Sequence, residues 1–462
     1  LELRFKFIQL LNKKLHTASM KYIDLCMSEK PWSIAYLLVQ CRGVILEAVK
    51  SPFWETALSE SSESGGQFDL RLSRSRAIKH SRSGVPDHDG RFMTFSQAFR
   101  AIHPMNPGSL RRSGQLYNTI FLGEYAQDVG GPYRESFAQY CAELQSSALP
   151  LLVRTPNGKQ SAGQNREMWL LNPGATSLTH MEMYSFLGKL MGIAIRGKEY
   201  LALNIAPFIW KLLVKDIPTS EDLEGIDYHQ VKVLKEIRHT DMSPEIFSSA
   251  FEDVGFTCVS TDDRTVDLMP NGQSVALTYE NRVEYCNLLE RYRLHEFDQQ
   301  AEAIRRGLAT VVPMRLLSLF SWDQLELMVC GMSTVDVALL RSVTEYSSCN
   351  AHDQHVRNFW QVLEEFTEEE KAAFLKFTWG RSRLPLNAAA FAQRFKLQSF
   401  GKSPADNYLP VSHTCFFSLE LPRYSTIEVM REKLRFAITH CLAIDGDDTS
   451  IGMQAAAMGW EE

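Results

Sequence analysis

The sequence lacks several features that would point to particular classes of protein. It has no long uninterrupted apolar run: its richest apolar stretch, LATVVPMRLLSLF at 308–320, contains a proline and an arginine. Membrane insertion is therefore not expected. It has no C-x-x-C pair, so a structural zinc site is not expected either. The formal net charge is −6, which gives no indication of a nucleic-acid partner.

The sequence also lacks an initiator methionine and a signal peptide. Residues 1–15, LELRFKFIQLLNKKL, instead have the pattern of an amphipathic helix. From the missing methionine we expect a fragment of a longer protein.

The composition is that of an ordinary globular protein. Apolar residues make up 45% and charged residues 23% of the 462 residues, a length that predicts two or three compact units. The nine cysteines are an odd number and do not suit a secreted disulfide framework. We expect most of them to be reduced, buried side chains in a cytoplasmic protein.

Apolar periodicity predicts that helices dominate the chain. Residues 1–58 should be helical with a break at Lys30-Pro31, and 180–197 should form a helix that is buried all round. Further helices are expected at 281–307, 356–366 and 367–377, and after Ser425. Their predicted N-terminal signals are Asn281 with Glu284, Thr367 with Glu370, and Ser425 with Glu428.

Turn residues predict the strands. PNG at 156–158 lies between LPLLVR and REMWLL, and PNG at 270–272 lies between TVDLM and QSVALT. Asn-Gly supplies the positive φ angles of a tight hairpin, so two hairpins are expected. The basic stretch RLSRSRAIKHSRSG at 71–84 is interpreted as a solvated strand and loop, because no aromatic residues alternate with its arginines.

One cysteine lies in an unusual context, LPVSHTCFFSLELP at 409–422. The segment predicts a strand and a turn before the last helix, with Cys415 at the turn. In a regular strand His413 and Cys415 would share a face, so the imidazole could polarise the thiol, or it could simply cap the turn. A buried structural cysteine is the alternative reading.

Four chemistries can be tested against the residues around this thiol. A cysteine phosphatase would need an arginine six residues later, where this chain has Leu421, so that reading fails. A papain-like hydrolase stays possible among twelve histidines but has no local signature here. Cys415 and His413 alone are too few ligands for a metal. Acyl carriage by thioester exchange remains, and it needs only an accessible thiolate and a positioned partner.

With these residues in place, the chain resembles the catalytic domain of HECT-type E3 ubiquitin ligases. The resemblance rests on seven segments in the family's order: GEYAQDVGGPYRES (123–136), HMEMYSFLGKLMGIAIRG (180–197), SEDLEGID (220–227), LMPNGQSVALTYENRVEYCNLLERYRL (268–294), LLSLFSWDQLELMVCG (316–331), NFWQVLEEFTEEEKAAFLKFTWGRSRLP (358–385) and LPVSHTCFFSLELPRYS (409–425).

The resemblance implies an α+β, bilobal fold. Its expected parts are a helical extension and loop (1–90), a mainly helical N-lobe (91–330) with a small E2-binding subdomain (about 225–295), a hinge at Gly331, Met332 and Ser333, and an α/β C-lobe (334–462).

The resemblance also implies an activity. In the family, the cysteine of the HTC motif accepts ubiquitin from an E2 as a thioester and passes it to a substrate lysine. That position is Cys415, with His413 and Thr414 as supporting neighbours. The E2-binding positions would be Leu234, Tyr285 and Leu289, for which packing inside the subdomain is an equal alternative. The implied partners are an E2, ubiquitin and protein substrates, with no cofactor and no metal.

The sequence departs from the family at several positions. Many relatives have asparagine two residues after the cysteine, where this chain has Phe417, and a Thr-Gly pair where it has Trp379-Gly380. These variants resemble the HERC ligases. The tail also differs, and whether Met458 or Trp460 replaces the usual phenylalanine is open. A HECT-shaped scaffold that binds E2 or ubiquitin without transfer is therefore the alternative function.

Overall fold

The computed structural model describes the chain except for residues 1, 17–21, 64, 125–130, 392 and 441–462, and it describes the backbone but not the side chain of Cys415. Its buried apolar side chains form three clusters, which run from Leu15 to Cys330, from Leu234 to Leu289 and from Val335 to Ile438. Helices predominate and the sheets are small, so the α+β class is confirmed. None of the helices in the described ranges combines the length and apolar character needed to cross a bilayer.

The first and largest cluster is built mainly from helices. Its elements are α1 (Glu2–Lys14), η3 (Leu25–Glu29), α2 (Ile34–Gln40), η4 (Arg42–Val44), α3 (Glu47–Glu60), β1 (Phe68–Leu72), α4 (Arg74–Ser81), α5 (Thr94–Ile102), η5 (Pro107–Leu110), β2 (Tyr117–Phe121), α6 (Gly131–Leu144), β3 (Leu152–Arg154), α7 (Pro156–Lys159), β4 (Trp169–Leu171), α8 (Leu178–Gly197), α9 (Pro207–Leu213), α10 (Ser220–Glu224), α14 (Asp298–Val311), α15 (Met314–Leu317) and α16 (Trp322–Cys330). We call this part the large body.

Helix α8 is the centre of the large body, and its predicted burial is confirmed. Its side chains from Met183 to Arg196 are almost all buried, and it packs along α14. The two helices approach so closely that a Cβ on Gly188 would lie 1.9 Å from the carbonyl oxygen of Ile304. A Cβ on Gly307 would lie 1.7 Å from the carbonyl oxygen of Ser185. Glycine is therefore required at this crossing.

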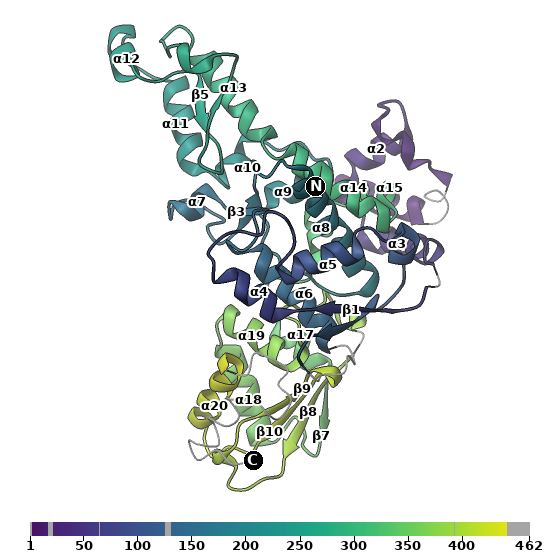
Figure 1. The fold of residues 1–462 in the computed structure, drawn as a ribbon. Helices are drawn as coiled ribbons and strands as arrows, with labels where there is room; N and C mark the ends of the chain where they lie inside the picture. Colours follow the sequence, from purple (N-terminus) through teal and green to yellow (C-terminus); the bar gives the residue numbers. More distant parts are fainter. Residues whose placement is uncertain (1, 17–21, 64, 125–130, 392, 441–462) are drawn as a thin grey trace.

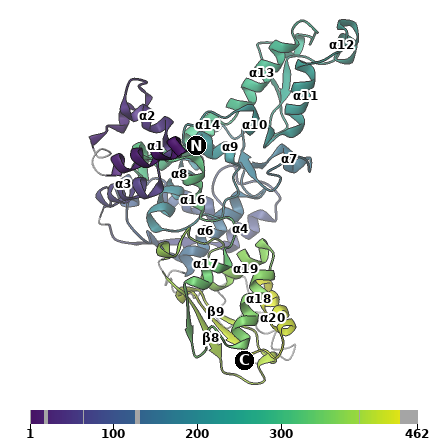
Figure 2. The same cartoon turned by 180° about the vertical axis from the view of Figure 1, so that it is seen from behind.

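The second cluster belongs to a small subdomain that projects from the large body (Figures 1 and 2). It consists of α11 (Tyr228–Arg238), α12 (Pro244–Ala250), β5 (Thr257–Val259), β6 (Thr265–Asp267), η6 (Gly272–Ser274) and α13 (Arg282–His295). A buried ionic group anchors its base: Arg293 pairs with Asp227 at 2.9 Å and with Glu296 at 3.0 Å.

The third cluster lies at the other end of the molecule. Its elements are α17 (Val337–Ser342), β7 (Thr344–Ser347), α18 (Gln354–Glu365), α19 (Glu368–Trp379), η7 (Ala388–Ala390), β8 (Phe395–Phe400), η8 (Ala405–Asn407), β9 (Val411–His413), η9 (Thr414–Phe416), β10 (Ser418–Pro422) and α20 (Ile427–His440). The sheet has the order β7-β8-β10-β9, and α18, α19 and α20 lie together beside it in both views. We call this part the C-terminal body.

Two helix predictions need correction. The segment expected to be one helix at 281–307 is two, α13 and α14, because Phe297 (φ −107°, ψ 4°) departs from helical geometry. At the same break the carboxylate of Glu296 accepts from the N–H of Thr261 at 2.6 Å. The second helix also continues past Gly307 to Val311. Asn281 does not cap α13; its side-chain oxygen accepts from the N–H of Thr278 instead.

The last helix starts differently from the prediction, whereas its neighbour agrees with it. Thr426, not Ser425, bonds the N–H of Val429 near the start of α20, while Ser425 donates to Asp406. For α19, the capping box of Thr367 with Glu370 is confirmed.

The first predicted hairpin is right in its pairing and wrong in its turn. β3 and β4 pair antiparallel, but Asn157 and Gly158 lie in the short helix α7 rather than in a tight turn. Asn157 there donates to the carbonyl oxygens of Gln164 and Gly225, so its side chain ties the loop to α10.

The second predicted hairpin is wrong. β6 pairs with the preceding strand β5, and residues 273–278 form no strand. Asn271 does adopt the positive φ (57°) that its type favours, but it leads into η6.

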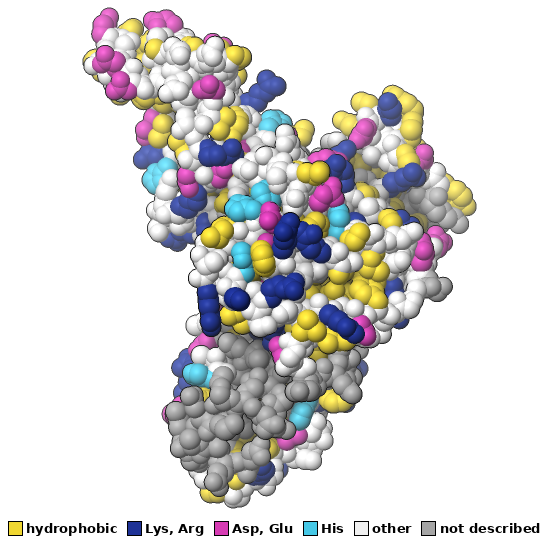
Figure 3. Space-filling model, in the orientation of Figure 1, with side chains coloured by type: hydrophobic (Ala, Val, Ile, Leu, Met, Phe, Trp, Pro, Cys, Tyr) yellow, Lys and Arg dark blue, Asp and Glu magenta, His cyan; other side chains and the backbone are white. Residues whose placement is uncertain are grey.

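The basic stretch 71–84 is only partly a loop. It contains the end of β1 and then α4, which Ser73 caps by accepting from the N–H of Arg76. Arg74 is bound to Glu135 at 2.6 Å, whereas Arg76, Lys79 and Arg82 are exposed. In Figure 3 basic side chains gather over the region of α4 and α5.

Candidate functional site

The HTC segment forms the reversal between two strands. β9 ends at His413, the backbone of Thr414, Cys415 and Phe416 makes one turn of 3-10 helix (η9), and β10 starts at Ser418. His413 is paired directly with Ser418 across the two antiparallel strands. The backbone of Cys415 therefore lies at the tip of a tight reversal, at the edge of the sheet.

Phe417 closes this turn in a conformation that its residue type rarely adopts. Its φ is 45° and its ψ is 54°, the left-handed region that costs a non-glycine residue on the order of 1–2 kcal/mol. The side chain is completely buried. Its ring stacks on Trp379 with centroids 4.1 Å apart and planes 8° apart, and it contacts Phe395 at 5.0 Å.

The side chain of His413 contacts an acidic neighbour. Its Nε2 lies 3.1 Å from Oε1 of Glu420, and both side chains are partly exposed. The expected shared face of His413 and Cys415 assumed a regular strand, and this condition is not met because the strand ends at His413. The role of His413 stays a prediction.

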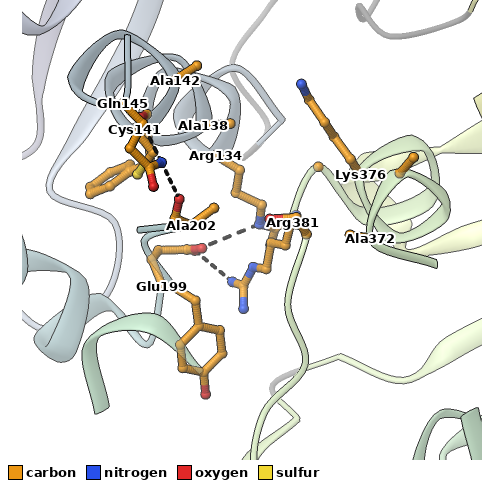
Figure 4. A pocket seen from close by; sticks show the side chains of 15 residues that line it. Arg134, Ala138, Cys141, Ala142, Gln145, Glu199, Ala202, Ala372, Lys376 and Arg381 are labelled. Atoms are coloured by element: carbon orange, nitrogen blue, oxygen red, sulfur yellow. Dashed lines mark hydrogen bonds and ion pairs between the residues drawn. The ribbon is translucent and has the colours of Figure 1, made fainter. Parts of the chain in front are cut away.

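The backbone of Thr414 contacts the large body. Its carbonyl oxygen accepts a hydrogen bond from Nη1 of Arg134 in α6, at 3.3 Å. Nε of Arg134 lies 3.7 Å from Oε1 of Glu199, and the same oxygen accepts a hydrogen bond from Nη2 of Arg381 at 2.7 Å (Figure 4). These side chains border a cavity of about 300 Å³ that is lined from both bodies.

The arginines after α19 dock the C-terminal body. Arg381 donates to the carbonyl oxygen of Lys198 as well as to Glu199, and Arg383 donates to Leu203 and Asn204. Burial lowers the pKa of Arg381, and Glu199 opposes that effect. The sequence reasoning missed both arginines and Arg134, because no local pattern marks a residue whose partner lies in another body.

The predicted hinge residues lie where the chain passes between the bodies. Gly331 ends α16 with a φ of 67° and a ψ of −169°, a region open essentially to glycine alone. The N–H of Met332 donates to the carbonyl oxygen of Leu384, so residues 331–333 run beside the arginine segment. That this segment acts as a hinge stays a prediction.

The three residues named for E2 binding lie inside the subdomain. Leu234, Tyr285 and Leu289 are 4%, 7% and 1% exposed and belong to its core, because their helical spacing points them inward. They do not form an exposed contact surface in this structure. The exposed apolar side chains of the subdomain are different ones: Tyr228, Val233, Met242, Ile246, Val259 and Val283.

The other described cysteines are poor nucleophiles or lie elsewhere. Burial raises the pKa of Cys141, Cys258 and Cys330 to about 12, which leaves each thiol protonated at neutral pH. Burial also raises the pKa of Cys286 and of Cys349. Cys26 in η3 and Cys41, between α2 and η4, are exposed but lie in the N-terminal part of the chain. Met458 and Trp460, considered for the tail, fall outside the described residues.

Comparison with known proteins agrees with this arrangement. The family model "HECT-domain (ubiquitin-transferase)" matches residues 139–444. The E3 ubiquitin-protein ligase HERC2 of Mus musculus is 42% identical over 375 residues, and that of Homo sapiens 41%. Both matches cover 80% of this chain, and the chain spans only 8% of either HERC2 protein. The probable E3 ubiquitin-protein ligase HECTD4 of Homo sapiens is 28% identical over 95% of this chain and 12% of its own length.

These matches confirm the resemblance that the seven segments indicated, including its HERC-like character. The matched residues include α6 from Gln139 onward, the subdomain, the passage at 331–333 and the turn at 414–416. The chain belongs to the HECT-domain (ubiquitin-transferase) family.

Proposed function

We propose that this chain is the catalytic part of an E3 ubiquitin ligase and that Cys415 carries ubiquitin as a thioester. The observation that carries the proposal is the position of the HTC segment, at a tight reversal on a sheet edge beside the junction of the two bodies. A turn at a sheet edge suits a reactive residue that two large protein partners must reach one after the other.

The chemistry consists of two acyl transfers. The Cys415 thiolate attacks the thioester carbonyl of a charged E2, a new C–S bond forms, and the E2 thiolate leaves. An amine of a substrate lysine then attacks the carbonyl, the C–N bond forms, the Cys415 thiolate leaves, and the nitrogen loses a proton. Thiol and thioester exchange at nearly equal energy, so the main task of the protein is to position the reacting groups.

We also propose a role in this scheme for each part of the chain. We assign E2 binding to the subdomain at about 225–295 and propose that the contact uses its exposed apolar side chains, such as Val233 and Ile246. Residues 91–330 would act as the N-lobe, 334–462 as the C-lobe, and 331–333 as the hinge that lets Cys415 travel. Residues 1–90 pack onto the same core as the N-lobe. The E2, ubiquitin and substrates remain proposed partners, and the cytoplasm remains the predicted compartment.

The test is a Cys415→Ala variant of this chain, incubated with E1, ATP, E2 and ubiquitin and then run on reducing and non-reducing gels. Wild-type protein should form an adduct that dithiothreitol removes, and the variant should form none while still binding charged E2. An adduct that persists in the variant would place the carrier on another cysteine.

The alternative, a scaffold that binds without transfer, rests on the departures at Phe417 and in the C-terminal tail. It predicts that the wild-type protein also forms no adduct, although it binds charged E2. A hydrolase would instead form an acyl-enzyme with small esters and would not need E2.

A further inference from the structure

The turn that carries Cys415 is held by two aromatic rings, at the two positions where the sequence differs from many HECT ligases and resembles the HERC ligases. Trp379 is the last residue of α19, and Phe417 follows η9. Their rings are stacked with centroids 4.1 Å apart, so the two departures form one contact. We propose that Trp379 and Phe417 are positioning residues that fix the turn at Thr414–Phe416 for ubiquitin transfer, a role that rests on the proposed function of Cys415.

The backbone shows why a ring at position 417 controls the turn. The N–H of Phe417 donates to the carbonyl oxygen of Thr414 at 3.4 Å, and its own carbonyl oxygen accepts from the N–H of Lys396 at 2.9 Å. Phe417 therefore closes the reversal and also ties it to β8. A displacement of the ring would move both hydrogen bonds and, with them, the backbone of Cys415.

The conformation of Phe417 needs this contact. A left-handed backbone is easy for glycine or asparagine and unfavourable for a bulky aromatic residue. The ring has no exposed surface, and it contacts Phe395 as well as Trp379. Burial and stacking therefore hold the strained residue in place, where asparagine would rely on its own backbone preference.

Trp379 is suited to stacking rather than to hydrogen bonding. Its side chain is 1% exposed, and its indole Nε1 has no hydrogen-bond partner among the described residues. Its plane lies within 8° of Phe417 and within 4° of Phe391. The guanidinium of Arg381, which is bound to Glu199 of the large body, lies 4.5 Å from its ring centroid. The stack thus joins the Cys415 turn to the contact between the bodies.

The experiment measures single-turnover transfer from an E2 charged with fluorescent ubiquitin to the 462-residue chain. Three quantities are read: the maximal rate constant, the E2 concentration at half-maximal rate, and the fraction of protein that forms the adduct. Phe417→Asn and Trp379→Leu should each lower the maximal rate about tenfold, with the half-maximal concentration unchanged. Trp379→Phe keeps a planar ring and should stay near the wild-type rate.

The choice of asparagine separates backbone conformation from stacking, because asparagine accepts the left-handed conformation but provides no ring. A purely structural role would lower the fraction of active protein and leave the rate of the folded fraction unchanged, which would overturn the proposal. Phe366→Leu, a buried change between α18 and α19 and so away from Trp379, is the matched control and should keep the wild-type maximal rate.

The two rings should also act as one unit. The double variant Phe417→Asn/Trp379→Leu is expected to transfer no more slowly than the slower single variant, because each single change already breaks the stack. Multiplicative losses, or Phe417→Asn at the wild-type rate, would overturn the proposal. A wild-type chain that forms no adduct at Cys415 would instead overturn the proposed function, so the two failures are distinguishable.

Discussion

At the scale of single residues, Asp87 shows how one buried carboxylate organises a connection. It is 1% exposed, and its oxygens accept from the backbone N–H groups of Arg91, Phe92 and Met93 at 2.7–3.0 Å. Burial alone would raise the pKa of Asp87, but these hydrogen bonds outweigh burial and hold the pKa below the ordinary value for an aspartate. The folded state therefore favours the ionised carboxylate.

A pH dependence follows from the lowered pKa of Asp87. A carboxylate whose pKa is lower in the folded state adds stability above the unfolded pKa, and this contribution disappears as the pH falls through the folded value. Asp87→Asn should therefore lower the free energy of unfolding by about 1.5–3 kcal/mol at pH 7, since it removes hydrogen bonds to a charged group. The gap between variant and wild type should narrow below pH 3.8.

Urea unfolding at several pH values measures this gap. The control is Asp69→Asn, an exposed carboxylate on β1 that should change the free energy of unfolding little at any pH. A gap that stays constant down to acid pH would contradict the assignment of the effect to the charge of Asp87.

Residue-scale prediction from the sequence succeeded where the signal was local. The HTC motif is contiguous, so its place in a strand and turn could be predicted before the contacts were known. Arg134 and Thr414 are 280 residues apart, and Arg381 and Glu199 are 182 apart. No periodicity or spacing predicts such pairs. Leu234, Tyr285 and Leu289 show that a local signal can also be ambiguous. Helical apolar spacing is the same for a buried face and for a binding face, and these three side chains are buried.

At the scale of elements, the crossing of α8 and α14 depends on two glycines. The Cβ of an alanine at position 188 would lie 1.9 Å from a carbonyl oxygen of the partner helix, and backbone cannot give way as a flexible side chain can. Gly188→Ala should therefore lower the free energy of unfolding by about 3 kcal/mol, the upper part of the range for overpacking. Chemical denaturation of the whole chain measures the change.

The matched control for this crossing is Gly43→Ala in η4, where an added Cβ would meet nothing within 4 Å. That change should leave the free energy of unfolding nearly unaltered. Equal effects of the two substitutions would show that lost glycine flexibility, rather than the close helix approach, determines the cost.

Elements were predicted well where periodicity alone decides them and poorly where a distant partner decides them. α8, α18 and α19 agree with the sequence because their apolar patterns are long and regular. The single helix expected at 281–307 is broken where Glu296 bonds Thr261, a partner 35 residues away that local periodicity does not reveal. The same Asn-Gly pair occurs in a short helix at 157–158 and at the start of a 3-10 helix at 271–272, since neighbouring contacts override the local preference.

At the scale of the whole molecule, the subdomain proposed to bind the E2 and the body that contains Cys415 lie at opposite ends of the large body. The subdomain projects at one end of the large body and the C-terminal sheet lies at the other (Figures 1 and 2). If the E2 binds the subdomain, the C-terminal body has to leave this arrangement to receive ubiquitin. The contacts that oppose its departure are those of Arg134, Arg381 and Arg383 with the opposite body.

Arg381 should contribute most of this resistance, because it is buried and bonded to both Glu199 and the carbonyl oxygen of Lys198. Removing one partner of a buried pair costs about 3–5 kcal/mol, which is enough to change which arrangement predominates. Arg381→Ala should therefore increase the radius of gyration in small-angle X-ray scattering. It should also accelerate hydrogen exchange at the amide of Met332, whose bond to Leu384 belongs to the docked arrangement.

Arg435→Ala provides the comparison, because this arginine also forms an ion pair, but with Glu370 inside the C-terminal body. It should leave both the scattering and the Met332 amide unchanged. If Arg381→Ala behaved in the same way, the bodies would be held by their connecting strands rather than by the arginines. Movement of the C-terminal body would then be opposed by the close contacts of Gly331, which the Arg381 substitution does not change.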